Sequence, residues 1–189
     1  MVLATARTTV KSRLDIDSTV TTFDSLIDGF VNDAVNRLFP KAMQDAGQYN
    51  QVVVIDSQTG QGIVSLTAST FDTYRSIEAL GSDGVPFPVR DTMQFGTNVR
   101  VRGLSSSVST PVIYGLKRYT LTTVPLELER AIYYYAMSDF YSFLVGNKRY
   151  YNAYMSNGRG EVESMDEIAA GLESKADAIV EEKSTYYGR

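Results

Sequence analysis

The apolar residues of this chain recur with two different periods, and the period changes twice. Over residues 23–38 they return every three or four positions, which is typical of a helix buried on one face. Between about 51 and 124 apolar and polar residues alternate, as in strands with one buried face. From Pro125 to the end the helical spacing returns. We therefore predict an α+β fold, a helical bundle with an antiparallel β region inserted over residues 51–124.

The N-terminal part is predicted to form two helices joined by a polar connector. Residues 3–14 read as a short amphipathic helix, and residues 15–22 are polar and β-branched. Thr21 is placed to cap the second helix, and Asp24 adds negative charge at its positive end. Pro40 ends this helix. Its apolar face consists of Phe23, Leu26, Ile27, Phe30, Ala34, Val35 and Leu38.

Three hairpins are predicted in the β region. They pair residues 51–56 with 62–67, 74–80 with 85–89, and 111–116 with 119–124. Pro86 and Pro88 place their strand at a sheet edge, because proline cannot donate a ladder hydrogen bond. The polar stretch 103–110 is predicted to be an exposed loop.

The C-terminal part is predicted to be helical throughout. Pro125 precedes a helix of about five turns that ends near Gly146. Residues 149–155 add one or two turns. Ser164 is placed to cap a last helix, which forms a C-terminal helical arm over residues 161–189.

Composition narrows the chemistry that the chain can perform. A net charge of −4 over 189 residues disfavours duplex binding as the main activity, because such domains are usually basic. The chain has no cysteine, and the absence of histidine removes the commonest general base and metal ligand. We predict no cofactor and no metal. The N-terminus lacks a signal-peptide pattern, and no apolar stretch approaches the roughly 18 residues that span a bilayer, so we expect a chain that is soluble when made and binds no membrane.

One short motif matches an enzyme signature. Residues 15–19 fit the DxDx[TV] string of haloacid-dehalogenase-type phosphatases, in which one Asp is the nucleophile and the other an acid or base. That chemistry needs a buried parallel strand before the motif, whereas residues 9–14 are polar and amphipathic. A small hydrolase that uses Asp15 and Asp17 is therefore an alternative, and a turn or capping role is the simpler interpretation.

Basic side chains in the β region are candidates for contact with a partner. They either meet an acidic surface or passing DNA, or they are solvated strand ends and loops. The residues of this candidate basic surface are Arg90, Arg100, Arg102, Lys117 and Arg118.

Tyrosines in the C-terminal part are candidates for a protein interface. Residues 133–135 are all tyrosine, and three successive helix residues cannot face one core. Tyrosine also suits interfaces, because it buries much area and keeps a polar tip. The candidate interface residues are Tyr133, Tyr134, Tyr141, Tyr150, Tyr151, Tyr154, Tyr186 and Tyr187. Residues 161–182 carry eight acids and one lysine, so the arm is either a solvated face or docks on a basic partner with Tyr186 and Tyr187 as anchors.

The stretches Leu26-Ile-Asp-Gly-Phe-Val-Asn-Asp-Ala34 and Pro111 to Leu121 resemble parts of the head–tail connector (adaptor) proteins of tailed phages. In that family an N-terminal helix precedes a β excursion. A proline–aromatic strand, a tight turn and a second strand then lead back into helices. The likeness in element order spans most of the chain, but the acidic, tyrosine-ended arm departs from the pattern.

The resemblance implies a structural virion protein with no enzymatic activity, built as a single adaptor domain over residues 1–189. Such a subunit belongs to a homo-oligomeric ring, a dodecamer by resemblance, in the virion neck. Its partners are further copies of itself, the portal protein and tail or neck proteins, and assembly takes place in the bacterial host cytoplasm. DNA passes through the lumen without sequence-specific binding. Another neck or tail-completion protein and a generic bacterial scaffold protein remain alternatives beside the phosphatase-like hydrolase.

Overall fold

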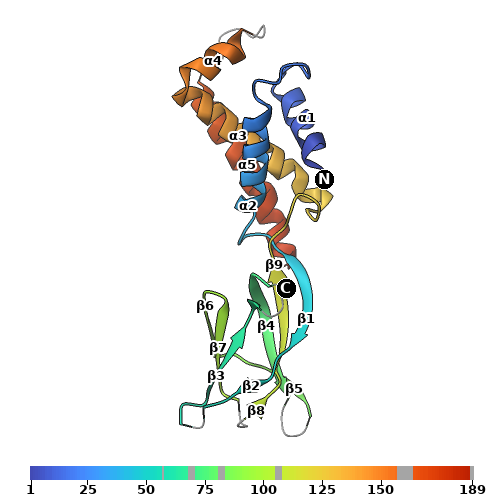
Figure 1. The fold of residues 1–189 in the computed structure, drawn as a ribbon, viewed down its shortest axis with the longest axis vertical. Coiled ribbons are helices and arrows are strands. Elements are labelled where there is room, and N and C mark those ends of the chain that lie inside the picture. The colour runs from blue at the N-terminus through green and yellow to red at the C-terminus, as the bar shows by residue number, and fades with distance from the viewer. Residues whose placement is uncertain (57, 68–70, 81–83, 105–107, 157–163, 188–189) are drawn as a thin grey trace. The chain divides into compact units, whose positions relative to one another are not determined.

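The computed structural model describes residues 1–56, 58–67, 71–80, 84–104, 108–156 and 164–187, and it confirms the α+β fold class. The chain divides into two compact units. Residues Met1–Ala42 and Tyr119–Arg189 make a helical unit, and Met43–Arg118 make a β unit (Figure 1). The alternation predicts a β region from about residue 51 to 124. The β unit begins earlier, at Met43, and also ends earlier, at Arg118.

The helical unit holds the five helices found in the described residues. Helix α3 is buried nearly all round, and α2 and α5 pack against it. Its buried positions account for the strongly apolar sequence of this segment. None of the described helices is both long and apolar enough to cross a membrane. The helices are α1 (Leu3–Arg13), α2 (Asp24–Arg37), α3 (Leu126–Gly146), α4 (Lys148–Met155) and α5 (Met165–Tyr187).

An aromatic cluster ties four helices of this unit together. Phe23, directly before α2, is fully buried, and its ring centroid lies 5.5 Å from that of Phe140 and 6.4 Å from that of Tyr154. Both pairs meet edge to face, an arrangement that stabilises beyond simple burial. The Tyr154 hydroxyl donates to the carbonyl of Leu14 at 3.1 Å. The cluster therefore joins the end of α1, the start of α2, the middle of α3 and the end of α4.

The start of α2 differs from the prediction that Thr21 caps it. The helix begins at Asp24, Phe23 occupies the N-cap position, and no side chain caps the helix. Thr21 instead contributes its carbonyl, which accepts from the Asp24 amide at 3.1 Å. The Asp24 carboxylate accepts from the ammonium of Lys11 at 3.0 Å. A tertiary ion pair thus replaces the local capping box.

Helix α5, the predicted C-terminal helical arm, packs along α3 through one side. Its buried side chains recur at helical spacing, as expected for a helix with one covered face. The spacing of the sequence predicts an apolar stripe of Met165, Ile168, Ala169, Leu172, Ala176 and Ile179. Ile168 and Ile179 are half-buried, and Val180 is buried although the sequence did not single it out. The buried residues are Met165, Ala169, Leu172, Ala176 and Val180.

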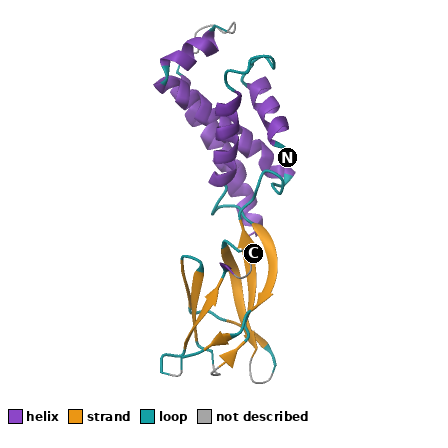
Figure 2. Cartoon of the chain, in the orientation of Figure 1, coloured by secondary structure: helices purple, strands orange, loops and turns teal. Residues whose placement is uncertain are grey.

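The β unit contains three antiparallel sheets within the described residues (Figure 2). The largest has the strand order β1 (Gln44–Asn50), β9 (Val112–Lys117), β4 (Thr73–Leu80) and β5 (Pro86–Pro88). The second has the order β3 (Gln61–Ser65), β7 (Asn98–Arg102) and β6 (Thr92–Phe95). Strand β2 (Val53–Val54) pairs with β8 (Val108–Ser109). Inward-facing aliphatic side chains from these sheets form a core of their own.

Two glycines allow the layers of the β unit to approach closely. A Cβ atom on Gly115 of β9 would overlap the ring of Phe71. A Cβ atom on Gly62 of β3 would lie 2.6 Å from a methyl carbon of Ile55 and would also contact Val53. Both positions need glycine because a side chain has no room there.

One predicted hairpin is confirmed and another is wrong. Strand β4 pairs with β5, and β5 lies at the sheet edge as its prolines predict. The hairpin of 111–116 with 119–124 does not form, because β1 and β4 occupy both edges of β9. Residues 119–124 make a turn instead, in which the Thr120 amide donates to the Thr123 hydroxyl at 2.9 Å.

The first predicted hairpin is correct in its turn and wrong in its pairing. The Asp56 amide donates to the Gln61 carbonyl at 2.9 Å, which closes the turn. The flanking strands then diverge, since β2 pairs with β8 and β3 with β7. The loop expected over 103–110 is also partly wrong, because Leu104 is buried and β8 forms; residues 105–107 lie outside the described residues.

Candidate interaction surface

The outer side of the sheet β3–β7–β6 carries large apolar side chains among polar ones. Val64, Val99 and Val101 point inward and are fully buried, so the alternate residues of the same strands point outward. In the register, Ile63 of β3 lies opposite Arg100 of β7, and Arg100 lies opposite Met93 of β6. These three residues therefore form one row across the sheet.

The apolar residues of this row and its neighbour are strongly exposed. Ile63 is 57% exposed, Met93 63% and Phe95 40%. The guanidinium of Arg100 lies over the Phe95 ring, 5.8 Å from its centroid. Arg102 is the next outward residue of β7. We call Ile63, Met93, Phe95, Arg100 and Arg102 the sheet face.

Exposed apolar residues are concentrated in the β unit. Of the ten large apolar side chains that are exposed in the described part of the chain, seven belong to the β unit. Single exposed apolar residues are ordinary, but neighbours on one face are typical of a binding surface. The seven are Val52, Val54, Ile63, Leu80, Val85, Met93 and Phe95.

The predicted basic residues do not form one patch on one strand pair. Arg100 and Arg102 share the sheet face, with an oxygen of Asp91 3.9 Å from Arg102. Lys117 and Arg118 lie at the end of β9 in the other sheet, where Arg118 is 3.6 Å from Asp72. Arg90 is exposed between β5 and β6. Alternation along β7 is the signal that separates the two arginines of the sheet face from the rest.

Helix α5 carries an acidic surface next to the apolar stripe that packs against α3. A shallow groove runs along it, in which small side chains alternate with acids. Three of its lining residues are small and three are acidic. We call Ala170, Glu173, Ser174, Asp177, Ala178 and Glu181 the α5 groove.

The inner border of the α5 groove is held by a charged network. The Asp177 carboxylate accepts from the Lys41 ammonium at 2.9 Å and from the Tyr135 hydroxyl at 2.7 Å. The hydrogen bond from Lys41, and then that from Tyr135, keeps the pKa of Asp177 below its usual value. Burial first, and then the hydrogen bond to Asp177, raises the pKa of Tyr135. Arg37 adds a contact to Glu173 at 3.4 Å.

Three of the predicted interface tyrosines belong to the core instead. Tyr133, Tyr141 and Tyr154 are at most 8% exposed, because α1, α4 and α5 surround α3 more completely than its sequence indicates. Burial raises the pKa of Tyr154 most, followed by its hydrogen bond with Tyr141. These three are therefore a correction to the predicted interface.

The other candidate tyrosines are half-buried or lie beyond description. Tyr134, Tyr150 and Tyr151 are partly exposed, and the Arg130 guanidinium lies over the Tyr134 ring at 5.3 Å. Tyr186 and Tyr187 end α5, and their side chains lie outside the described residues. Contact of these tyrosines with a partner stays a prediction.

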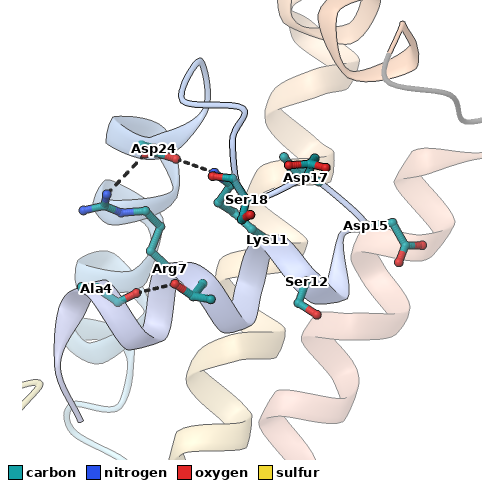
Figure 3. Close-up of a pocket in the computed structure, with 10 residues that line it drawn as sticks. Ala4, Arg7, Lys11, Ser12, Asp15, Asp17, Ser18 and Asp24 are labelled. Carbon is teal, nitrogen blue, oxygen red and sulfur yellow. Dashed lines mark hydrogen bonds and ion pairs between the residues drawn. The ribbon is translucent and has the colours of Figure 1, made fainter.

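A polar cleft lies between α1 and α2, lined by charged residues of both helices and the connector (Figure 3). Lys11 is buried, and its ammonium donates to the carbonyls of Ser18 and Val20 at 3.0 and 2.6 Å. It also donates to Asp24 at 3.0 Å. Arg7 makes two hydrogen bonds of 2.7 Å to the Asp28 carboxylate. These cations hold the connector and α2 against α1, so the cleft is a structural junction.

Asp15 and Asp17, the residues of the phosphatase alternative, lie on this connector and do not converge. Both residues are exposed, and they follow a helix, not a buried strand. Figure 3 shows the two carboxylates apart. Asp17 accepts from the Thr19 amide at 2.8 Å and the Thr19 hydroxyl at 2.7 Å, and these bonds lower the pKa of Asp17. The residues are turn formers, and the phosphatase hypothesis fails on its required context.

The described residues contain no group of three or more acids that could hold a metal ion. No protein-family model and no curated protein matches this sequence. Among solved structures, the chain is similar to a protein of the neck of an empty gene transfer agent particle computed with C6 symmetry. The identity is 10%, the TM-score 0.28, and the match covers 90% of this chain and 87% of that one.

A second similar structure comes from the virion of a native gene transfer agent particle. Its identity is 11% and its TM-score 0.29, with 91% of this chain and 88% of that chain covered. Both TM-scores are low, so the likeness does not by itself assign a fold or a function to this chain.

Proposed function

We propose that this chain is a structural subunit of the neck of a tailed phage or phage-like particle, an adaptor in the ring between portal and tail. The observation that carries the proposal is the sheet face, because a unit with its own core exposes large apolar side chains together on one surface. Covering such a surface is favourable by about 25 cal/mol for each Å² of apolar area removed from water. The chain's own chemistry is thus suited to assembly.

The two units have different roles in this proposal. The helical unit satisfies its charges internally, through pairs such as Lys11 with Asp24 and Lys41 with Asp177. The β unit carries seven of the ten exposed large apolar side chains of the described residues. A contact between unlike surfaces of neighbouring copies repeats around an axis and closes into a ring when the rotation permits. No bond is made or broken.

The charge distribution suits a subunit past which DNA moves. The β unit contains six acidic and six basic residues, so the net charge of −4 resides in the helical unit. An acidic or neutral lumen repels phosphates weakly and lets DNA slide, whereas rows of arginine would bind it. In the proposed ring, DNA therefore passes without sequence-specific contact.

The partly exposed Tyr134, Tyr150 and Tyr151 are proposed to contact the portal or a tail protein. Tyrosine at the margin of a covered core keeps its hydroxyl available for hydrogen bonds to a partner. Lys117, Arg118 and Arg90 are proposed as polar contacts at the rim of such an interface, where charges govern association rate more than affinity.

Size-exclusion chromatography with light scattering tests the proposal, with purified portal protein of the same particle and without it. We expect a ring-sized species, or a complex with portal, that electron microscopy shows as a ring. A monomer that ignores portal at all salt concentrations contradicts the proposal. Binding to a tail protein but not to portal identifies the chain as another neck or tail-completion protein.

A further inference from the structure

We propose that an exposed surface on α1 and α3 docks an acidic segment of the portal protein. Its residues are Arg13, Leu126, Arg130 and Tyr134, and we call them the arginine surface. The inference rests on the proposed function, in which Tyr134 contacts the portal or a tail protein. It adds the residues that act with Tyr134 and the chemistry of their partner. The portal is the occupant to which we commit, because an adaptor that joins the head to the tail must hold it.

Two guanidinium groups of this surface lie over tyrosine rings of α3. The Arg130 guanidinium is 5.3 Å from the centroid of the Tyr134 ring, and its Nε donates to the Tyr134 hydroxyl at 2.9 Å. The Arg13 guanidinium, at the end of α1, is 5.0 Å from the centroid of the Tyr133 ring and 5.9 Å from that of Tyr134. Contact with the rings restricts both arginine side chains, so they lose little freedom when they bind a carboxylate.

Arg13 and Arg130 are exceptions to the internal pairing of charges in the helical unit. Both are exposed, and neither has a carboxylate partner among the residues that the structure describes. By contrast, Arg7 makes two hydrogen bonds of 2.7 Å to the Asp28 carboxylate. A guanidinium can donate two parallel hydrogen bonds to one carboxylate, and such charge-assisted bonds are stronger than neutral ones. The arginine surface is therefore suited to carboxylates that its own unit does not supply.

Leu126 adds an apolar side chain to the same side of α3. It is 78% exposed, more than any other large apolar residue of the described chain. Leu126 lies four residues before Arg130, which lies four residues before Tyr134, so the three follow one line along the helix. Tyrosine and arginine are also enriched among the residues that dominate protein interfaces. The partner that fits therefore presents an aliphatic side chain with carboxylates beside it.

Nucleic acid and a second copy fit this surface less well than a different protein. A phosphate backbone gains nothing from Leu126, and two cations neutralise few phosphates. The sheet face of a second copy carries Arg100, and like charges oppose such contact. Acids of the helical unit such as Asp28 and Asp177 are already bound to cations of that unit, so they are not free for a neighbouring copy.

Charge reversal tests the inference on the full chain. Equilibrium binding to immobilised, purified portal protein is measured for wild type, Arg13→Glu, Arg130→Glu and Leu126→Asp. We expect each variant to weaken binding at least about tenfold, because each loses a contact and places a negative charge against carboxylates. Lys175→Glu, which reverses an exposed lysine of α5, is the control and should bind like wild type. Circular dichroism confirms that every variant folds.

Two further measurements separate the portal from the other occupants. Sedimentation velocity follows self-association of the free chain, and fluorescence anisotropy follows binding to a short DNA duplex. We expect the three variants to behave like wild type in both. If they lose self-association or duplex binding, the surface meets a second copy or nucleic acid, and the inference is wrong.

The failure of the inference and that of the proposed function give different results. If wild type binds portal and all three variants bind it equally well, the docking surface is wrong and the proposed function stands. A wild type that forms rings but ignores portal also overturns the inference alone. If wild type forms no ring and does not bind portal at any salt concentration, the proposed function itself is wrong.

Discussion

Replacing Lys11 with methionine should destabilise the helical unit strongly, although Lys11 is a surface-type residue. Methionine keeps the length of the apolar stem and removes only the ammonium. The Lys11 side chain is 5% exposed, and its ammonium donates to two backbone carbonyls and to the Asp24 carboxylate. The variant thus isolates the polar contribution of one atom to the junction between α1, the connector and α2.

The size of the effect follows from the groups left behind. Removing one partner of a buried ion pair costs about 3–5 kcal/mol when the remaining charge is fully enclosed. Asp24 is 24% exposed and keeps Arg7 at 3.4 Å, and Ser18 is exposed, so water can hydrate part of what Lys11 leaves. The expected loss is therefore at the lower end, about 3 kcal/mol.

Urea unfolding followed by far-ultraviolet circular dichroism reports mainly on the helical unit. With a slope of roughly 1–3 kcal/mol per molar urea, the midpoint should fall by about 1–3 M. Lys175→Met, at an exposed lysine of α5, is the matched control and should change stability by less than about 0.5 kcal/mol. If Lys11→Met unfolds within that same margin of wild type, Lys11 does not hold the junction.

Three further changes test other parts of the fold. Phe23→Ala opens a cavity where a fully buried ring stood and should cost the helical unit about 4 kcal/mol in urea unfolding; a loss below about 1 kcal/mol would contradict the aromatic cluster. Gly115→Ala forces the Phe71 ring to move and should destabilise the β unit by about 1–3 kcal/mol, measured by hydrogen exchange of β9 amides, while unchanged protection would refute the close approach. The lowered pKa of Asp177 means that its bond from Lys41 stabilises the native state above the unfolded pKa, and this stability is lost as pH falls through the folded pKa. Wild type should thus be more stable than Asp177→Asn at neutral pH, and the gap should close in acid; a gap that persists when the carboxyl is protonated would show another cause.

The helices could be predicted from the sequence because their signals are local. The three-and-four spacing of α2 and α3, and the prolines beside them, report directly on which side of each helix is covered. Strand pairing is not local in this way. The β-branched residues 119–124 suit a strand, but β9 has no free edge to offer them. Strand β1 was missed because its sequence, Gln-Asp-Ala-Gly-Gln-Tyr-Asn, is polar and its pairing depends on β9.

The interaction surface was only partly predictable for the same reason. Arg100 and Arg102 were singled out by charge, but Ile63 and Met93 join them only through a register between three strands. The tyrosines show the opposite error. Three successive tyrosines do point in different directions, yet other helices cover two of those directions, so Tyr133 and Tyr135 are both buried. Sequence periodicity describes one element, and burial depends on how many others pack around it.

Many charged side chains of the helical unit are paired within that unit, whereas apolar side chains of the sheet face are exposed. This difference favours the sheet face as a surface used in assembly. The sequence predicts no partner for Arg7 or Lys41, but in the structure both are bound to carboxylates of the helical unit. On the sheet face, Ile63 and Met93 could be polar without loss of the inward-facing core, because alternation separates the two sides of each strand. Their apolar character is thus not required by the inward-facing core, and a surface that covers them would account for it.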